Sequence, residues 1–123
     1  MPERLLTDAE LEVMRALWER GEGTVRDVLG DLDRDLAYTT VSTTLRILEG
    51  KGFVTSRKEG RSHVYAPAES KPRYEARSVN HLLGSVFDGD RLALVRQLVE
   101  STPVDRDELA ALHALLDQRL EEE

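Results

Sequence analysis

Residues 38–67, YTTVSTTLRILEGKGFVTSRKEGRSHVYAP, decide the fold that we expect for this chain of 123 residues. At 100° per residue, one narrow apolar stripe holds Val41, Leu45 and Leu48, which predicts a helix with a single buried face. After residues 50–52, GKG, the pattern changes from a period near 3.6 to a period of two. The two glycines tolerate a positive φ, so the helix is expected to end there.

A β-hairpin is expected directly after this helix. The β-rich runs 53–57 and 62–65 flank residues 58–61, KEGR, which form a turn that contains glycine. Three cations gather at the predicted tip: Arg57, Lys58 and Arg61. A polar helix followed at once by a basic hairpin is typical of a winged helix-turn-helix. The alternative is an ordinary α+β corner whose charged tip is simply solvated.

The face of the predicted helix that lies opposite the apolar stripe carries hydroxyl groups and one guanidinium, with almost no carboxylate. Short side chains let a helix approach another surface closely, and hydroxyl and guanidinium groups donate hydrogen bonds to phosphates and base edges. The residues of this candidate DNA-binding face are Thr39, Thr40, Ser42, Thr43 and Arg46.

The composition, 40% hydrophobic and 33% charged, is typical of a soluble globular protein with one domain or two small ones. There is no cysteine, which excludes disulfides and thiolate metal sites. No apolar run approaches the ~20 residues that a membrane-spanning helix needs, and no signal peptide opens the chain. A cytoplasmic protein without membrane insertion is therefore expected.

The net charge of −7 is unusual for a nucleic-acid-binding protein, so its distribution along the chain matters. Residues 1–37 hold 5 basic and 10 acidic side chains, and residues 68–123 hold 7 basic and 12 acidic ones, which gives −5 for each segment. Residues 38–67 hold 5 basic and 2 acidic side chains, which gives +3. The positive segment coincides with the predicted helix and hairpin, and the acidic remainder would discourage indiscriminate DNA binding.

Two further helices are expected before this segment. Thr7 and Glu10 have the spacing of a capping box, so a helix should start near Asp8. Its apolar face consists of Leu11, Met14, Leu17 and Trp18. Thr24 then caps a short second helix, followed by an acidic turn over residues 30–35. The inward-facing residues of this short helix are Val25, Val28 and Leu29.

Together, residues 6–32, LTDAELEVMRALWERGEGTVRDVLGDL, and 36–67, LAYTTVSTTLRILEGKGFVTSRKEGRSHVYAP, resemble the penicillinase-repressor family, the BlaI/MecI-like transcriptional repressors. The resemblance implies a mainly α fold with a small β-hairpin wing. It divides the chain into a winged-helix DNA-binding domain over residues 1–67 and a three-helix dimerisation domain over residues 68–123. It also implies repression at a dyad-symmetric operator of β-lactamase or related resistance or stress genes.

By this resemblance, the recognition helix contributes the same five residues as the candidate DNA-binding face. Better-known relatives carry more basic residues where this chain has Thr39 and Ser42, so the base preference should differ. Arg57, Lys58 and Arg61 are expected to contact the DNA backbone. Copper-responsive relatives carry a cysteine motif near the C-terminus, and this chain lacks it.

Beyond the breaker-rich residues 67–72, apolar stripes predict helices over residues 76–87, 92–99 and 109–120, the last of them capped by Asp105 with Glu108. These 56 residues are too few to bury so much apolar surface alone, so we expect a homodimer. Folding back onto the N-terminal domain is the alternative. The expected dimerisation residues are Leu82, Leu83, Val86, Leu92, Val95, Leu98, Val99, Leu109, Leu112 and Leu116.

The resemblance also implies how repression ends. Similar family members are inactivated when a membrane sensor-transducer leads to a proteolytic cut in the dimerisation domain. The matching position here is Gln97-Leu98, where the cleaved relatives typically carry Asn-Phe. A sensor or a protease is therefore an expected partner, beside double-stranded operator DNA and a second copy of the chain.

An enzyme is not expected. The three histidines, His63, His81 and His113, share no metal-ligand spacing with nearby carboxylates, so neither a metal nor another cofactor is expected. No Ser-His-Asp order, phosphate-binding glycine loop or paired carboxylate set stands out. Two other classes of function stay open: a winged-helix protein-interaction module, and a ligand-responsive regulator of another winged-helix family. The positive charge of residues 38–67 favours DNA over the first.

Overall fold

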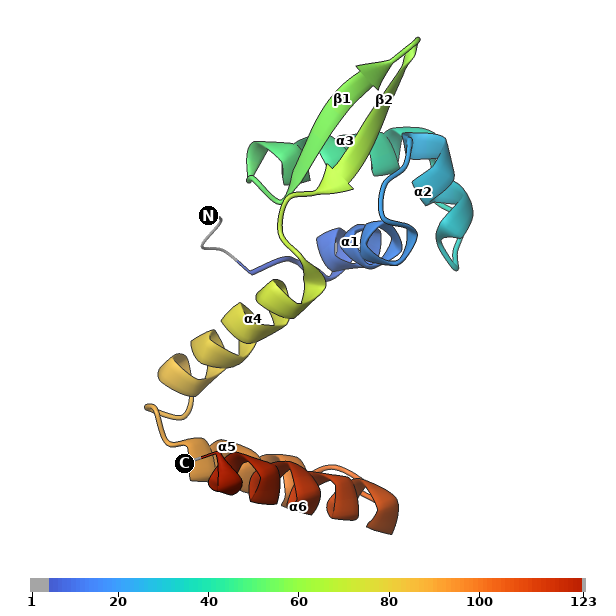
Figure 1. Cartoon of the computed structure of the whole chain (residues 1–123). Coiled ribbons are helices and arrows are strands. Elements are labelled where there is room, and N and C mark those ends of the chain that lie inside the picture. Colours follow the sequence, from blue (N-terminus) through green and yellow to red (C-terminus); the bar gives the residue numbers. More distant parts are fainter. Residues whose placement is uncertain (1–4, 123) are drawn as a thin grey trace. The chain divides into compact units, whose positions relative to one another are not determined.

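A computed structural model describes residues 5–122, which form six helices and one two-stranded antiparallel hairpin (Figure 1). The chain divides between Ser78 and Val79 into two compact units. Within the described residues, the helices are too short or too polar to cross a membrane. The elements are α1 (Asp8–Arg20), α2 (Val25–Asp31), α3 (Tyr38–Gly50), β1 (Val54–Glu59), β2 (Ser62–Pro67), α4 (Lys71–Ser85), α5 (Arg91–Glu100) and α6 (Arg106–Glu121).

The first two helices both begin with a capping box, which satisfies backbone N–H groups that have no partner inside the helix. The Thr7 hydroxyl accepts from the Glu10 N–H at 3.2 Å, and the Glu10 carboxylate accepts from the Thr7 N–H at 2.9 Å. Thr24 and Asp27 repeat this arrangement at 3.2 and 3.0 Å. The predicted starts of both helices are confirmed. The predicted end of α2 is wrong by two residues, because Gly30 and Asp31 lie within the helix rather than in the turn.

The helix predicted from residue 38 is present as α3, and its end is also as predicted. Its buried residues are the three of the apolar stripe: Val41, Leu45 and Leu48. Gly52 has φ 87°, a backbone conformation that favours glycine, and this turns the chain from α3 into β1.

The hairpin is present, but its strands are longer than predicted. Pairing runs from Val54 opposite Pro67 to Glu59 opposite Ser62, so Lys58 and Glu59 belong to β1 rather than to the turn. The turn itself consists of two residues, Gly60 and Arg61, and Gly60 has φ 61°. This suits a type II′ turn, in which glycine occupies the first central position and the backbone twist matches that of the strands.

The loop between α1 and α2 adds a third backbone segment to the base of the hairpin. Gly23 donates its N–H to the Tyr65 carbonyl at 3.0 Å and accepts from the Tyr65 N–H at 2.8 Å. A Cβ atom at position 23 would lie 2.7 Å from Cδ of Arg20 and 3.0 Å from Cβ of Asp27. Glycine therefore leaves room for the Arg20 and Asp27 side chains, which a Cβ atom at this position would crowd.

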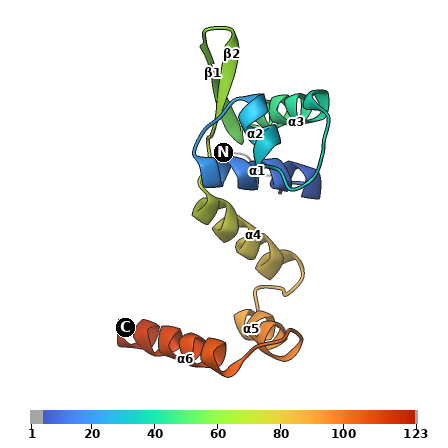
Figure 2. The ribbon, with the colours of Figure 1, turned by 90° about the vertical axis from the view of Figure 1, so that its right-hand side faces the viewer.

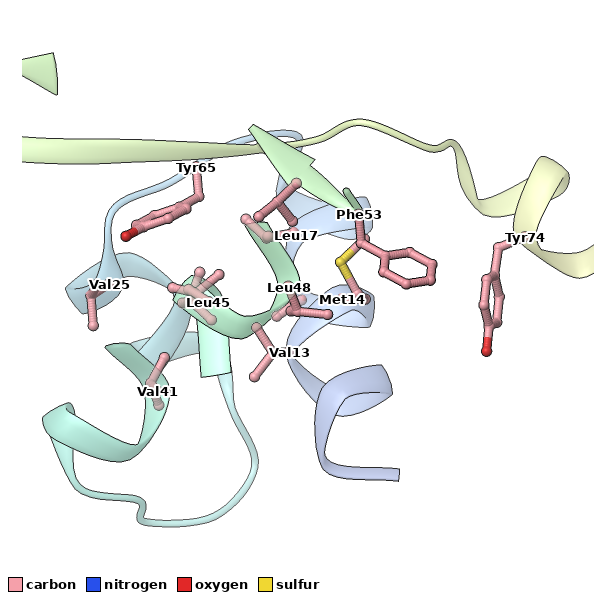
Figure 3. Close-up of a cluster of buried hydrophobic side chains, with 13 residues drawn as sticks. Val13, Met14, Leu17, Val25, Val41, Leu45, Leu48, Phe53, Tyr65 and Tyr74 are labelled. Carbon is pink, nitrogen blue, oxygen red and sulfur yellow. The ribbon is translucent and has the colours of Figure 1, made fainter. Parts of the chain in front are cut away.

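The core of the N-terminal unit draws side chains from all of its elements. Figure 3 shows the Phe53 ring between Met14 and Tyr74, and both Phe53 and Met14 are fully buried. Tyr74 belongs to the first turn of α4, and its ring centroid lies 5.6 Å from that of Trp18 and 6.2 Å from that of Phe53. Its hydroxyl accepts from the Leu6 N–H at 2.9 Å. The start of α4 thus completes this core.

The C-terminal unit buries little within one chain. Neither α5 nor α6 has a buried residue. Both begin with an aspartate cap, since Asp90 accepts from the Ala93 N–H at 3.1 Å and Asp105 accepts from the Glu108 N–H at 2.8 Å. The second of these caps confirms the predicted one. Phe87, which the sequence placed at the end of a helix, lies in the turn after α4.

Candidate nucleic-acid interface

The outer face of α3 carries the predicted contact residues. Thr39, Thr40, Thr43 and Arg46 are exposed there, and Ser42 is half-buried on the flank toward the hairpin. The one carboxylate of α3, Glu49, accepts a hydrogen bond of 2.5 Å from the Ser56 hydroxyl on β1. The exposed face is therefore a row of hydroxyls and one guanidinium.

The hairpin cations are not equivalent. Lys58 and Arg61 are exposed, and neither forms an ion pair within residues 5–122. Arg57 instead binds the Glu22 carboxylate at 2.5 and 3.1 Å and the Glu59 carboxylate at 3.0 Å. The hydrogen bond from Arg57 lowers the pKa of Glu22, and the same hydrogen bond raises the pKa of Arg57. The sequence grouped the three cations, whereas the structure separates Arg57 from the other two.

Lys51, the remaining cation of the positive segment apart from Arg46, has a structural partner. Its Nζ lies 2.6 Å from Oε2 of Glu10, which is buried inside the capping box of α1. Burial would raise the pKa of Glu10, but hydrogen bonds from Lys51 and Thr7 outweigh it and hold this pKa below its ordinary value. Lys51 therefore links the end of α3 to the start of α1. Because Glu10 compensates its charge, Lys51 adds little to the positive electrostatic potential of the candidate DNA-binding face.

A hollow of about 160 Å³ lies where α2, α3 and the hairpin meet, and we name it the arginine hollow. Figure 2 shows these three elements beside one another. The Arg26 guanidinium lies over the Tyr38 ring, with its Cζ 5.3 Å from the ring centroid. Among residues 5–122, no carboxylate lines the hollow. Its charged and polar lining includes Arg26, Tyr38, Ser42, Arg46, Arg61 and His63.

Sequence reasoning missed Arg26 and Tyr38, whereas it placed His63 on the hairpin, where the structure has it. Arg26 is a single cation in an acidic segment, and nothing in the local pattern links it to Arg46 or Arg61. One clue was available, because the first helix of a helix-turn-helix crosses the DNA backbone, where a cation such as Arg26 can meet a phosphate.

Nine of the ten expected dimerisation residues lie on α4, α5 and α6, and Val86 lies in the turn directly after α4. Most of them are exposed in the single chain, while Leu83 and Val99 are half-buried. The bond between Gln97 and Leu98 lies inside α5, and both side chains are exposed. The exposed members are Leu82, Val86, Leu92, Val95, Leu98, Leu109, Leu112 and Leu116.

Comparisons with known sequences agree with this geometry. Residues 6–118 match the penicillinase repressor family. The transcriptional regulator BlaI of Mycobacterium tuberculosis is 40% identical over 115 residues, which cover 90% of this chain and 82% of that protein. The penicillinase repressor of Bacillus licheniformis is 27% identical over 115 residues, which cover 92% of this chain and 90% of that protein.

Two solved structures resemble the N-terminal part of the chain. The DNA-binding domain of the repressor BlaI matches with a TM-score of 0.51 and 34% identity, over 56% of this chain and 87% of that one. The monomeric form of Bacillus licheniformis BlaI in complex with the blaP half-operator matches with a TM-score of 0.50 and 33% identity, over 58% of this chain and 89% of that one. The fold is thus a winged helix, and this chain belongs to the penicillinase-repressor family.

Proposed function

We propose that this chain is a dimeric, sequence-specific transcriptional repressor that acts in the cytoplasm on a dyad-symmetric DNA operator. The observation that carries this proposal is the outer face of α3, where hydroxyls and Arg46 stand exposed without a competing carboxylate. The family of the chain and the half-operator complex of a relative 33% identical to it support the same conclusion.

In this proposal α3 lies in the major groove. Arg46 reads a base edge, most naturally O6 and N7 of guanine, because a guanidinium matches that pair of acceptors. The threonine and serine hydroxyls bind nearby bases or phosphates. Lys58 and Arg61 on the hairpin neutralise backbone phosphates, which adds affinity but carries no sequence information.

A second copy of the chain would cover the apolar residues of the C-terminal unit. Neither α5 nor α6 buries a residue alone, and their exposed leucines recur at helical spacing. A two-fold dimer presents two copies of α3, which suit operator half-sites about one helical turn apart. Occupation of such a site at a promoter would block transcription of resistance or stress genes.

Release of repression would follow a cut between Gln97 and Leu98, made by a protease or through a membrane sensor. This bond lies inside α5, so the helix has to open locally before a protease can bind it. Loss of the dimer removes the gain from linking two half-site contacts, ~10²–10⁴ in avidity. In induced cells we expect a shortened protein that retains the winged helix. Intact protein at an active target promoter would contradict cleavage.

Selection from a random duplex library with the full chain tests the core of the proposal. We expect enrichment of an inverted repeat, and footprinting of the enriched duplex should protect two half-sites on one side of the helix. Failure to enrich any sequence, or binding that does not distinguish the enriched duplex from a random one, would contradict a sequence-specific repressor.

A further inference from the structure

The arginine hollow holds three cations that come together only in the folded protein. Arg26 comes from α2, Arg46 from α3 and Arg61 from the hairpin turn. Within residues 5–122, none of the three forms an ion pair with a carboxylate. Like charges that share a site repel one another, and an anion placed among them relieves this repulsion. The arrangement is therefore complementary to an anion.

We propose that the arginine hollow binds one phosphate of the DNA backbone and that Arg26 is a DNA contact. The inference rests on the proposed function and adds a site to it. The hollow is about 160 Å³, and about 10–15 Å³ suffices for one water molecule, so a phosphate group fits with water around it. Ser42 and His63 add further hydrogen-bonding groups to its wall.

The Tyr38 ring prepares Arg26 for this role. The Arg26 guanidinium lies over the Tyr38 ring and is attracted by its π face, while the N–H donors that do not face the ring can bind a phosphate. This contact also restricts the side chain before DNA arrives, so less rotational freedom is lost on binding. Tyr38 is thus a positioning residue that acts through Arg26.

The position of the hollow suits a phosphate next to the bases that α3 reads. Arg46 and Ser42 belong both to the hollow and to the candidate DNA-binding face of α3. A phosphate bound there fixes where α3 lies along the groove, which is the usual role of backbone contacts. The hollow therefore sets the register in which Arg46 meets its base.

Binding of full-length variants to the duplex selected by the wild-type chain tests this inference. Arg26→Ala should weaken binding to the selected and random duplexes alike, on the order of 3- to 10-fold, and lower the salt slope by about one. Arg15→Ala is the matched control, since Arg15 is an exposed arginine on α1 that does not line the hollow. Equal behaviour of the two variants would overturn the proposal.

Tyr38→Leu should weaken binding about 2- to 5-fold in the wild-type background and have no further effect beside Arg26→Ala. Tyr38→Phe, which keeps the ring, should bind like the wild type. Independent losses from Tyr38→Leu and Arg26→Ala would contradict the positioning role.

Duplexes with single neutral methylphosphonates locate the phosphate itself. One position in each half-site should weaken wild-type binding and lose its effect with Arg26→Ala. If no position loses its effect in that variant, Arg26 does not bind a phosphate and the inference fails. If the wild-type chain binds no duplex at all, the proposed function fails instead, so the two failures are distinct.

Discussion

The guanidinium of Arg57 on β1 binds the carboxylate of Glu22, with N···O distances of 2.5 and 3.1 Å. Glu22 precedes Gly23, whose backbone pairs with Tyr65 of β2, so the loop between α1 and α2 contacts both strands of the hairpin. A DNA phosphate would have to displace a carboxylate that is already bound to Arg57. On the hairpin, Lys58 and Arg61 are therefore more readily available to bind DNA phosphates than Arg57.

The two neighbouring hairpin cations should consequently differ in DNA binding. Lys58→Ala should weaken binding to all duplexes alike and lower the salt slope by about one. Arg57→Ala should change this slope by clearly less, because Glu22 and Glu59 already compensate its charge. Glu22→Gln should raise the affinity for random duplex by freeing Arg57. Salt titrations of the three variants decide this, and equal slopes for the two cation variants would contradict it.

Arg46→Ala should cost ~1–3 kcal/mol on the selected operator and relax the preference at one base pair of each half-site. The reason is the loss of two hydrogen bonds to a single base edge. On random duplex, the same variant should lose much less binding free energy. Fluorescence anisotropy with both duplexes measures the difference, and Arg15→Ala again serves as the charge-matched control. An equal loss of binding free energy on both duplexes would indicate that Arg46 contacts the DNA backbone and not a base.

Glu10→Gln should reduce stability by about 1–3 kcal/mol at neutral pH, because the ion pair with Lys51 is lost while the cap acceptor stays. The pKa of Glu10 is lowered in the folded state, so its contribution is complete above the ordinary glutamate pKa. It disappears as the pH falls through the folded value. Urea unfolding of wild type and variant should therefore converge in acid. A constant difference from neutral to acidic pH would refute this.

Tyr74→Ala should destabilise the N-terminal unit by about 3 kcal/mol, because a buried ring that contacts Trp18 and Phe53 is removed. Tyr74→Phe should cost only about 0.5–1.5 kcal/mol, for the lost acceptor of the Leu6 N–H. Trp18 is the single tryptophan, so its fluorescence during urea unfolding reports on this unit alone. If Tyr74→Ala left the free energy of unfolding unchanged, α4 would contribute nothing to this core.

Leu112→Glu should convert the proposed dimer to a monomer, since a carboxylate would be placed in the apolar contact between the two copies. Gln118→Glu introduces the same charge on α6 but 240° further around the helix, and should leave the dimer intact. Sedimentation of both full-length variants distinguishes them. Identical sedimentation of the two variants and the wild type would remove α6 from the interface.

The sequence predicted those parts of the molecule that local chemistry determines. The stripe of Val41, Leu45 and Leu48 marks α3, and the glycines around Lys51 mark its end. The hairpin follows from alternation and from Gly60, although the ladder continues to Glu59 because a two-residue turn closes it there.

The parts that sequence did not predict depend on residues far apart in the chain. Glu22 and Arg57 are 35 positions apart, and no periodicity connects them. Arg26 approaches the other cations of the arginine hollow only after α2 has packed against α3. Tyr74 lies beyond the breaker-rich segment that suggests a domain boundary, yet its ring fills the N-terminal core.

Because α5 and α6 bury no residue within one chain, repression would also depend on the concentration of the protein in the cell. Under the proposed pairing, the folding of these two helices gains its free energy from a second copy. The melting temperature of this part should then rise with protein concentration, while that of the winged helix stays constant. Since dimers form with the square of the monomer concentration, a modest fall in synthesis would empty the operator disproportionately. Gene dosage would thus affect operator occupancy, in addition to any inducing stimulus.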